Sequence, residues 1–233
     1  MKLKTPISRI AEMILMIICI IAGVIAIVSK AQAEELVYQA KSADGGETPV
    51  IVYVGGSGWR TEGTILENEC FENTNIIYIC CRTKKYNLTS VWRAEERKEQ
   101  ADRILRVVRE QFPKVKDIVI MTYSAGGCMA EPIYDRSREN GMRTKCAVML
   151  DSVFRKYPPD RMKADGLPVM YAVSRTDIET HVTGWTRKWI EDNGLDAKAY
   201  DCTHGELETL NDVQRDIWQF IRQGGKRYAA SAM

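Results

Sequence analysis

Residues 118–127 read IVIMTYSAGG, an apolar run that stops abruptly at Ser124 between small residues. The run has the length of a buried strand, and the small residues after it allow the chain to turn sharply into a helix. This pattern is typical of a nucleophile elbow, in which the residues two before and two after the serine must be small. Gly126 meets that requirement, whereas Thr122 stands where the motif has glycine. The stretch predicts a strand, a nucleophilic serine and a helix, in that order. The alternative is an ordinary turn, and the rest of the chain must decide between the two interpretations.

Apolar runs of strand length recur along the chain and alternate with segments of helical spacing. The runs are Val50–Val54, Ile76–Cys81, Ile118–Met121, Cys146–Leu150, Val169–Val173 and Ala197–Cys202. Apolar residues at helical spacing lie between them, for example within residues 101–112 and 207–221. Strands that alternate with helices pair in parallel through right-handed crossovers. We therefore predict an α/β fold in one domain, a doubly wound, mostly parallel sheet of about six core strands flanked by helices.

The N-terminal segment has the pattern of a signal peptide. Basic residues at positions 2, 4 and 9 precede Met13–Val28, which carries no charge, and Ala31-Gln32-Ala33 offers small residues at a cleavage spacing. As a helix the uncharged run would extend about 24 Å, less than a hydrocarbon core of about 30 Å. Cleavage is therefore favoured over an uncleaved membrane anchor. We expect residues 1–33 to be removed or to anchor the chain, residues 34–225 to form an extracytoplasmic (secreted or periplasmic) domain, and residues 226–233 to be a flexible tail.

Charge and cysteine content bear on three expectations: a nucleic-acid partner, disulfide bonds and a bound metal. The formal net charge is +2, but residues 1–33 contribute +3, so the remaining domain is slightly acidic and no nucleic-acid partner is expected. Six cysteines follow the signal segment, at positions 70, 80, 81, 128, 146 and 202. Their spacing resembles no disulfide scaffold, which favours packing as small buried residues over disulfides. No pair of CxxC motifs occurs, and neither a metal nor an organic cofactor is predicted.

The residues that follow the predicted strands form a chemically coherent set. Ligands of open parallel sheets collect at the carboxyl ends of the strands. The first strand leads into Gly55-Gly56-Ser57-Gly58-Trp59, the third into Ser124, the fifth into Ser174-Arg175-Thr176-Asp177, and the last into Thr203-His204-Gly205. A serine becomes a nucleophile when a base takes its proton and a carboxylate orients that base. The three strand ends supply one residue of each kind.

Each partner of Ser124 has a rival in the sequence. His181 competes with His204 for the base, and Asp151, at the end of another apolar run, competes with Asp177 for the acid. The order serine, acid, histidine and the position after the last strand favour Asp177 and His204.

With these residues the chain resembles the α/β-hydrolase family, through T-Y-S-A-G, S-R-T-D and C-T-H-G, over Pro49 to Gly224. The resemblance implies a catalytic triad of Ser124, Asp177 and His204. It also implies an oxyanion hole formed by the backbone N–H of Ala125 with that of Gly56 or Ser57. Only residues 154–166 separate the fourth and fifth core strands, too few for a helical cap domain, so an open site is expected.

The function expected from this resemblance is that of an exported serine hydrolase that cleaves carboxylic esters through an acyl-enzyme. The expected partner is a small-molecule ester or acyl substrate. A peptidase or acyltransferase of the same fold is one alternative. A non-catalytic, hydrolase-like surface binding protein is another, because Thr122 departs from the elbow motif.

Candidate substrate-binding residues crowd the same strand ends. They are Trp59, Tyr123, Arg155 and Arg175. Cations follow three of the strands, at Arg82, Lys84, Lys85, Arg155, Lys156 and Arg175. We interpret them first as solvated loop charges, and alternatively as a rim that attracts anionic substrates.

Overall fold

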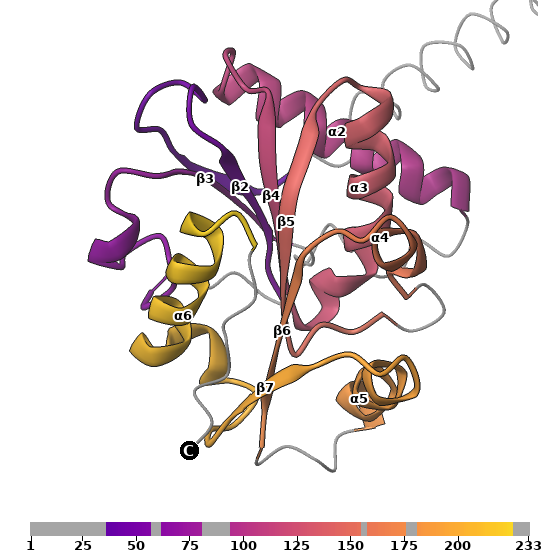
Figure 1. Cartoon of the computed structure of the whole chain (residues 1–233). Coiled ribbons are helices and arrows are strands. Elements are labelled where there is room, and N and C mark those ends of the chain that lie inside the picture. Colours follow the sequence, from indigo (N-terminus) through magenta and orange to yellow (C-terminus); the bar gives the residue numbers. More distant parts are fainter. Residues whose placement is uncertain (1–35, 57–61, 81–93, 155–157, 176–180, 226–233) are drawn as a thin grey trace, which may run out of the picture. The chain divides into compact units, whose positions relative to one another are not determined.

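A computed structural model describes residues 36–56, 62–80, 94–154, 158–175 and 181–225. Its centre is a seven-stranded sheet in the order β1-β3-β2-β4-β5-β6-β7 (Figure 1). The strands are β1 (Tyr38–Lys41), β2 (Val50–Val54), β3 (Asn75–Ile79), β4 (Asp117–Tyr123), β5 (Arg143–Leu150), β6 (Val169–Ser174) and β7 (Ala197–Tyr200). All neighbours pair in parallel except β1, which runs antiparallel to β3 at the edge. The predicted parallel sheet is confirmed.

The edge strand β1 is the element that the sequence pattern missed. It has four residues, none of them buried, and its only neighbour is β3. The central strands β2 and β3 are buried at every position. Parallel strands covered on both faces read as continuous apolar runs, which is why they could be recognised, whereas a short, polar edge strand gives no such signal.

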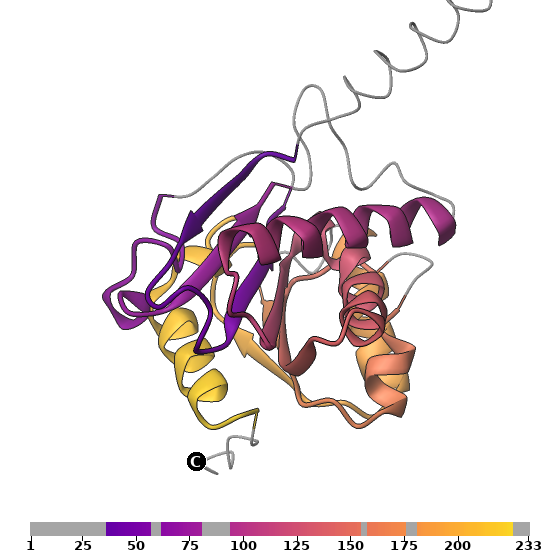
Figure 2. The ribbon, with the colours of Figure 1, turned by 90° about the horizontal axis from the view of Figure 1, so that it is seen from above.

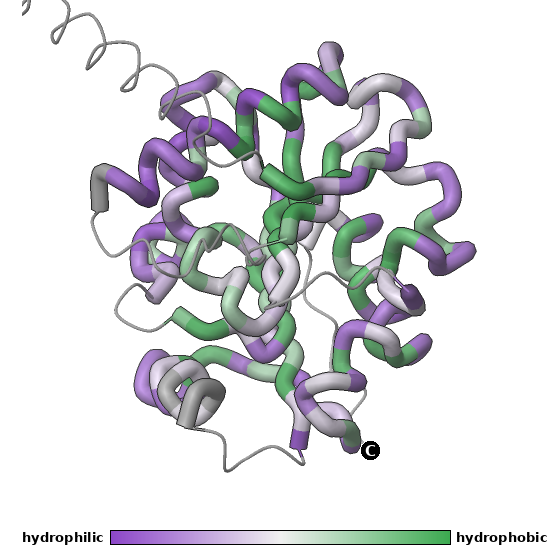
Figure 3. Tube along the Cα trace, turned by 180° about the vertical axis from the view of Figure 1, so that it is seen from behind, coloured by the Kyte–Doolittle hydropathy of each residue, from purple (hydrophilic) through white to green (hydrophobic). Residues whose placement is uncertain are grey.

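Helices cover both faces of the sheet and create two separate cores. Helices α2 (Ala94–Gln111), α3 (Ala130–Glu139), α4 (Asp160–Ala164) and α5 (His181–Asp192) pack on one face, and α6 (Asn211–Arg222) packs on the other (Figures 1 and 2). Successive residues of β2 alternate between the two cores: Val52 and Val54 pack with the α2 side, and Ile51 and Tyr53 with the α6 side. The hydrophobic tube segments accordingly lie along the strands, and the outer turns of the helices are hydrophilic (Figure 3).

Three short 3₁₀ helices complete the described chain. They are η1 (Glu69–Phe71), η3 (Ser124–Met129) and η4 (Leu207–Thr209). Between β5 and β6 the described chain contains only the five-residue helix α4, so no cap domain is inserted there. The predicted signal peptide and the predicted tail lie outside the described residues. Within the described ranges, no helix is long and apolar enough to cross a membrane.

Five of the six cysteines after the signal segment are described, and no disulfide joins any two of these five. Cys80, Cys128, Cys146 and Cys202 are buried, which confirms the packing interpretation for these four, and Cys70 is exposed. Burial raises the pKa of the Cys146 thiol to about 12, so this thiol stays protonated at neutral pH. Cys81 lies outside the described residues. Among the residues that are described, no group of three or more His, Cys, Asp or Glu side chains could hold a metal ion.

Candidate active site

Ser124 stands directly after β4, at the first residue of η3, in a left-handed backbone conformation with φ of 50°. Few residues other than glycine adopt this conformation, and it is common at functional sites. Two glycines make the turn sterically feasible. A Cβ on Gly126 would lie 2.2 Å from the carbonyl oxygen of Val54, and one on Gly127 would lie 2.6 Å from the backbone nitrogen of Val153. The predicted strand, serine and helical turn are therefore present, and glycine is required at both positions.

Thr122 fits the elbow because its side chain is bonded to the neighbouring strand end. It is fully buried, and its Oγ1 lies 2.7 Å from the Oγ of Ser152. The Ser152 hydroxyl donates in turn to the carbonyl oxygen of Thr122, at 2.9 Å. A hydrogen-bonded hydroxyl can be buried without the penalty of an unpaired polar group. The departure from the glycine of the motif is thus accommodated, with β4 joined to the segment after β5.

His204 lies in the loop after β7, the edge strand of the sheet, and reaches Ser124 after β4. Its Nε2 lies 2.9 Å from Oγ of Ser124, a hydrogen-bond distance suited to proton transfer. Tyr123 holds the histidine from a second side: the two rings are stacked with centroids 5.0 Å apart and planes at 22°, and the phenol donates to the carbonyl oxygen of His204 at 2.6 Å. The structure thus brings Ser124 and His204 together as predicted, whereas the rival His181 is the first residue of α5.

The described carboxylate that meets His204 is Asp151, the rival of the predicted acid Asp177. The Oδ2 of Asp151 lies 3.1 Å from Nδ1 of His204. Asp151 directly follows β5, the strand beside β4. Because the two strands are parallel neighbours, Asp151 lies at the same edge of the sheet as Ser124. Asp177, the acid expected from chain order, lies outside the described residues. Chain order could not separate the two, because both aspartates fall between Ser124 and His204.

Asp151 is anchored by the end of β6. It is 1% exposed, and its backbone is left-handed with φ of 39°. Ser174 donates its backbone N–H to Oδ1 at 3.0 Å and its hydroxyl to Oδ2 at 2.5 Å. The guanidinium of Arg187, on α5, donates to the carbonyl oxygen of Ser174. The role of Ser174 was not predicted from the sequence. The available signal was a polar residue at the end of a buried apolar run.

No protein-family model and no curated protein matches the sequence. Among solved structures, the chain is similar to a lipase-esterase related protein from Clostridium acetobutylicum, with a TM-score of 0.55 and 14% identity over 82% of this chain and 99% of that one. It is also similar to MenH from S. aureus (TM-score 0.54, 12% identity, 81% and 99% covered) and to mouse alpha/beta hydrolase domain-containing protein 10 (TM-score 0.52, 11% identity, 81% and 92% covered). The chain has the α/β-hydrolase fold. The predicted fold class is confirmed.

In this α/β-hydrolase fold, the backbone of Gly56 lies against the elbow. A Cβ on Gly56 would lie 3.1 Å from Cβ of Ser124 and 3.1 Å from the ring of Tyr123. Ala125, whose N–H follows the serine directly, is half-buried. Gly56 and Ala125 therefore border the serine, as the predicted oxyanion hole requires, and Ser57 lies outside the described residues.

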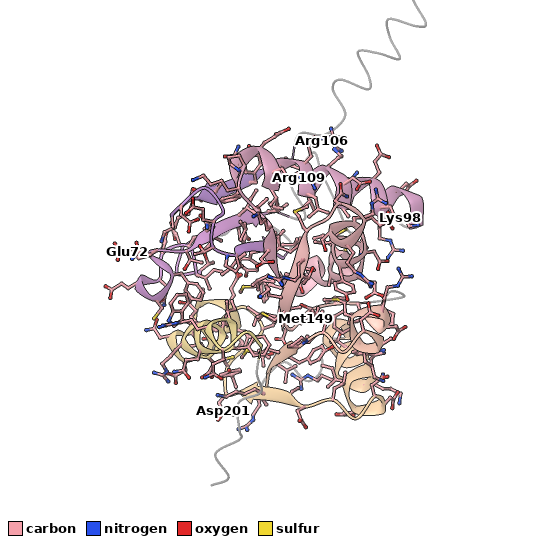
Figure 4. The ribbon with its side chains drawn as sticks, turned by 45° about the horizontal axis from the view of Figure 1, so that its top comes forward. Glu72, Lys98, Arg106, Arg109, Met149 and Asp201 are labelled. Atoms are coloured by element: carbon pink, nitrogen blue, oxygen red, sulfur yellow. The ribbon has the colours of Figure 1, made fainter. Side chains whose placement is uncertain are left out.

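The predicted substrate-binding residues fall into three groups. Trp59 and Arg155 lie outside the described residues. Tyr123 is buried and packs on His204. Arg175 is exposed and forms an ion pair at 2.9 Å with Asp201, itself at the surface beyond β7 (Figure 4). The other five cations of the predicted rim lie outside the described residues, so the anionic-substrate interpretation remains a prediction.

Proposed function

We propose that this protein is a serine hydrolase that cleaves carboxylic esters with a triad of Ser124, His204 and Asp151. The observation that carries the proposal is the unbroken row of hydrogen bonds from Asp151 through both nitrogens of His204 to Ser124, at 3.1 and 2.9 Å. Nucleophile, base and orienting carboxylate at these distances are the geometric signature of acyl-transfer catalysis.

The mechanism follows from the positions of these groups. Oγ of Ser124 attacks the ester carbonyl carbon while its proton moves to Nε2 of His204, and the carbonyl oxygen becomes an oxyanion. The backbone N–H of Ala125, with that of Gly56 or Ser57, stabilises this charge. The tetrahedral intermediate then expels the alcohol, which takes the proton from Nε2. Water, activated by the same nitrogen, hydrolyses the acyl-enzyme and restores Ser124.

Asp151 fixes the imidazole in the productive tautomer. An ionised carboxylate at Nδ1 accepts the hydrogen from that nitrogen, so Nε2 carries a lone pair toward Ser124. The same carboxylate stabilises the imidazolium that forms during attack. Because Ser174 donates to both of its oxygens, the carboxylate is oriented before substrate binds.

Two features support an ester hydrolase over the alternatives. One fold neighbour is described as a lipase-esterase related protein. The hydrogen bond between Thr122 and Ser152 also supports a catalytic interpretation, since it accommodates the departure from the elbow motif. A peptidase or acyltransferase uses the same triad, and parallel assays on amides and on acceptor alcohols distinguish these activities.

The test is labelling by a fluorophosphonate probe together with hydrolysis of p-nitrophenyl esters of graded chain length. Ser124→Ala should abolish labelling and lower kcat on the order of 10⁶-fold, and His204→Ala should be about as damaging because a triad acts as one unit. His181→Ala is the matched control, with near-normal kcat. Full activity of a folded Ser124→Ala protein would overturn the proposal.

We further propose that the enzyme is exported, because residues 1–33 have the pattern of a signal peptide. Mass spectrometry of the mature protein should then find Glu34 as its first residue. A full-length chain that is released only by detergent would show that the segment is retained as an anchor.

A further inference from the structure

Tyr123 contacts three parts of the proposed site. It directly precedes Ser124 in the chain, its ring is stacked on His204, and a Cβ on Gly56 would lie 3.1 Å from its Cδ1 and Cε1 atoms. The ring therefore lies close to both the imidazole and the backbone of the loop after β2. We infer that Tyr123 is a positioning residue, which sets His204 against Ser124 and stabilises the imidazolium form. This inference rests on the proposed function.

Tyr123 anchors the loop that carries His204. Thr203 donates its backbone N–H and its hydroxyl to Glu206, at 2.8 and 2.7 Å, and these bonds are internal to the loop. The phenol of Tyr123 instead ties the carbonyl oxygen of His204 itself to β4, at 2.6 Å. The hydrogen bond thereby couples the position of the base to the strand that carries the nucleophile.

The stacked ring of Tyr123 also acts on His204 electrostatically. A cation over the face of an aromatic ring within about 6 Å of its centroid is attracted by the ring quadrupole. In the proposed mechanism the imidazole of His204 becomes a cation when it takes the proton of Ser124, and its ring is stacked on that of Tyr123 at a centroid distance of 5.0 Å. The stacking therefore stabilises the transition state more than the resting state, which is the condition for a contribution to kcat.

Tyr123 is buried within the protein. The residue is 7% exposed, and its phenol already has a partner within the protein. Its backbone is extended, with φ of −130° and ψ of 137°, immediately before the left-handed Ser124. The backbone of the elbow thus sets the direction in which the Tyr123 side chain points. Little of the ring surface is accessible to a substrate. Positioning of His204 replaces the substrate-binding role expected for Tyr123 from the sequence.

Two variants of Tyr123 separate the phenol from the ring. Tyr123→Phe keeps the stacking and removes one hydrogen bond, and it should lower kcat for p-nitrophenyl acetate up to about tenfold. Tyr123→Leu removes both contacts and should lower kcat about a hundredfold. In both variants KM should stay within about twofold of the original value, because the lost interactions act on the transition state. The rate of labelling by a fluorophosphonate should fall in parallel with kcat.

Tyr134→Phe is the matched control. It removes the phenol of another buried tyrosine, on α3, whose hydroxyl donates to Asp165 at 2.8 Å. It should lose a similar amount of stability while kcat and the labelling rate stay unchanged.

Three results would overturn the inference: an unchanged kcat in Tyr123→Phe, a raised KM at constant kcat, or an equal loss of kcat in Tyr134→Phe. The second would assign Tyr123 to substrate binding. If Tyr123→Leu does not fold, Tyr123→Phe decides alone. Failure of the proposed function is distinguishable, because Ser124→Ala would then retain esterase activity whatever the Tyr123 variants do.

Discussion

Strands β4 and β5 are neighbours, and each is followed directly by a residue that adopts a backbone conformation typical of glycine. Ser124 has φ of 50° and Asp151 has φ of 39°, and within the described ranges no other non-glycine residue has a positive φ. The two ends differ in what holds them. The turn at Ser124 depends on Gly126 and Gly127, two and three residues away, whereas Asp151 is held by Ser174 and His204, 23 and 53 residues away.

This difference explains what each end can tolerate. The elbow is a steric arrangement, so changes there should act on folding first. The acid is an electrostatic arrangement assembled from three strand ends, so changes there should act on catalysis while the fold survives. Substitutions at the elbow glycines should therefore change the free energy of unfolding, and substitutions at the acid should change kcat.

After the Ser124 and His204 variants, the largest effect on kcat is expected at the acid. Asp151→Asn keeps the shape of the side chain but places a donor where the hydroxyl of Ser174 and Nδ1 of His204 both need an acceptor. The imidazole then loses its productive tautomer, and kcat should fall about 10⁴-fold, as such a change does in other serine triads. Ester hydrolysis at saturating substrate measures this loss, with thermal unfolding as the check on folding.

Asp177→Asn is the matched control for the acid assignment, because it changes the carboxylate that chain order favoured. Its kcat should stay within about twofold of the original value, because Asp151 already supplies the carboxylate at Nδ1 of His204. If Asp177→Asn caused the larger loss, Asp151 would be reduced to a structural residue and the comparison between the two strand ends would fail.

A smaller effect, on stability, is expected at the elbow. The Cβ of Gly126→Ala would meet the carbonyl oxygens of Val54 and Gly55 at 2.2 and 2.7 Å, and backbone atoms cannot move aside as a flexible side chain can. The free energy of unfolding should fall by about 3 kcal/mol, at the upper end of overpacking costs. Urea denaturation measures it.

Gly184→Ala is the control for the elbow, since a Cβ there meets nothing within 4 Å and the residue lies inside α5. It should be neutral or stabilising by up to about 1 kcal/mol, because alanine favours the helix. Equal costs at the two glycines would contradict the steric account of the elbow.

The contrast between local and distant partners also determines how much of the molecule could be predicted from the sequence. The six core strands, Ser124 and its glycines were recognisable because their requirements are met by adjacent residues. His204 could be chosen over His181 because it follows the last strand. Asp151 could not be chosen over Asp177, because the decision depends on which strand lies beside β4 and on the donors of Ser174, and neither is encoded near either aspartate. The edge strand β1 was missed for lack of an apolar pattern.

The smallest effect is expected where the two ends are joined, at the hydrogen bond between Thr122 and Ser152. Thr122→Val keeps the β-branched shape and removes Oγ1, while Ser152 still donates to the carbonyl oxygen of residue 122. The free energy of unfolding should fall by about 1 kcal/mol, the usual net worth of one buried hydrogen bond, with kcat within about twofold. Thr122→Gly sharpens the result, because it restores the glycine of the motif. If the motif glycine were optimal here, that variant would be the more stable one. The structure predicts the reverse, since Thr122→Gly loses the same hydrogen bond, empties a fully buried site and adds backbone entropy to the unfolded chain.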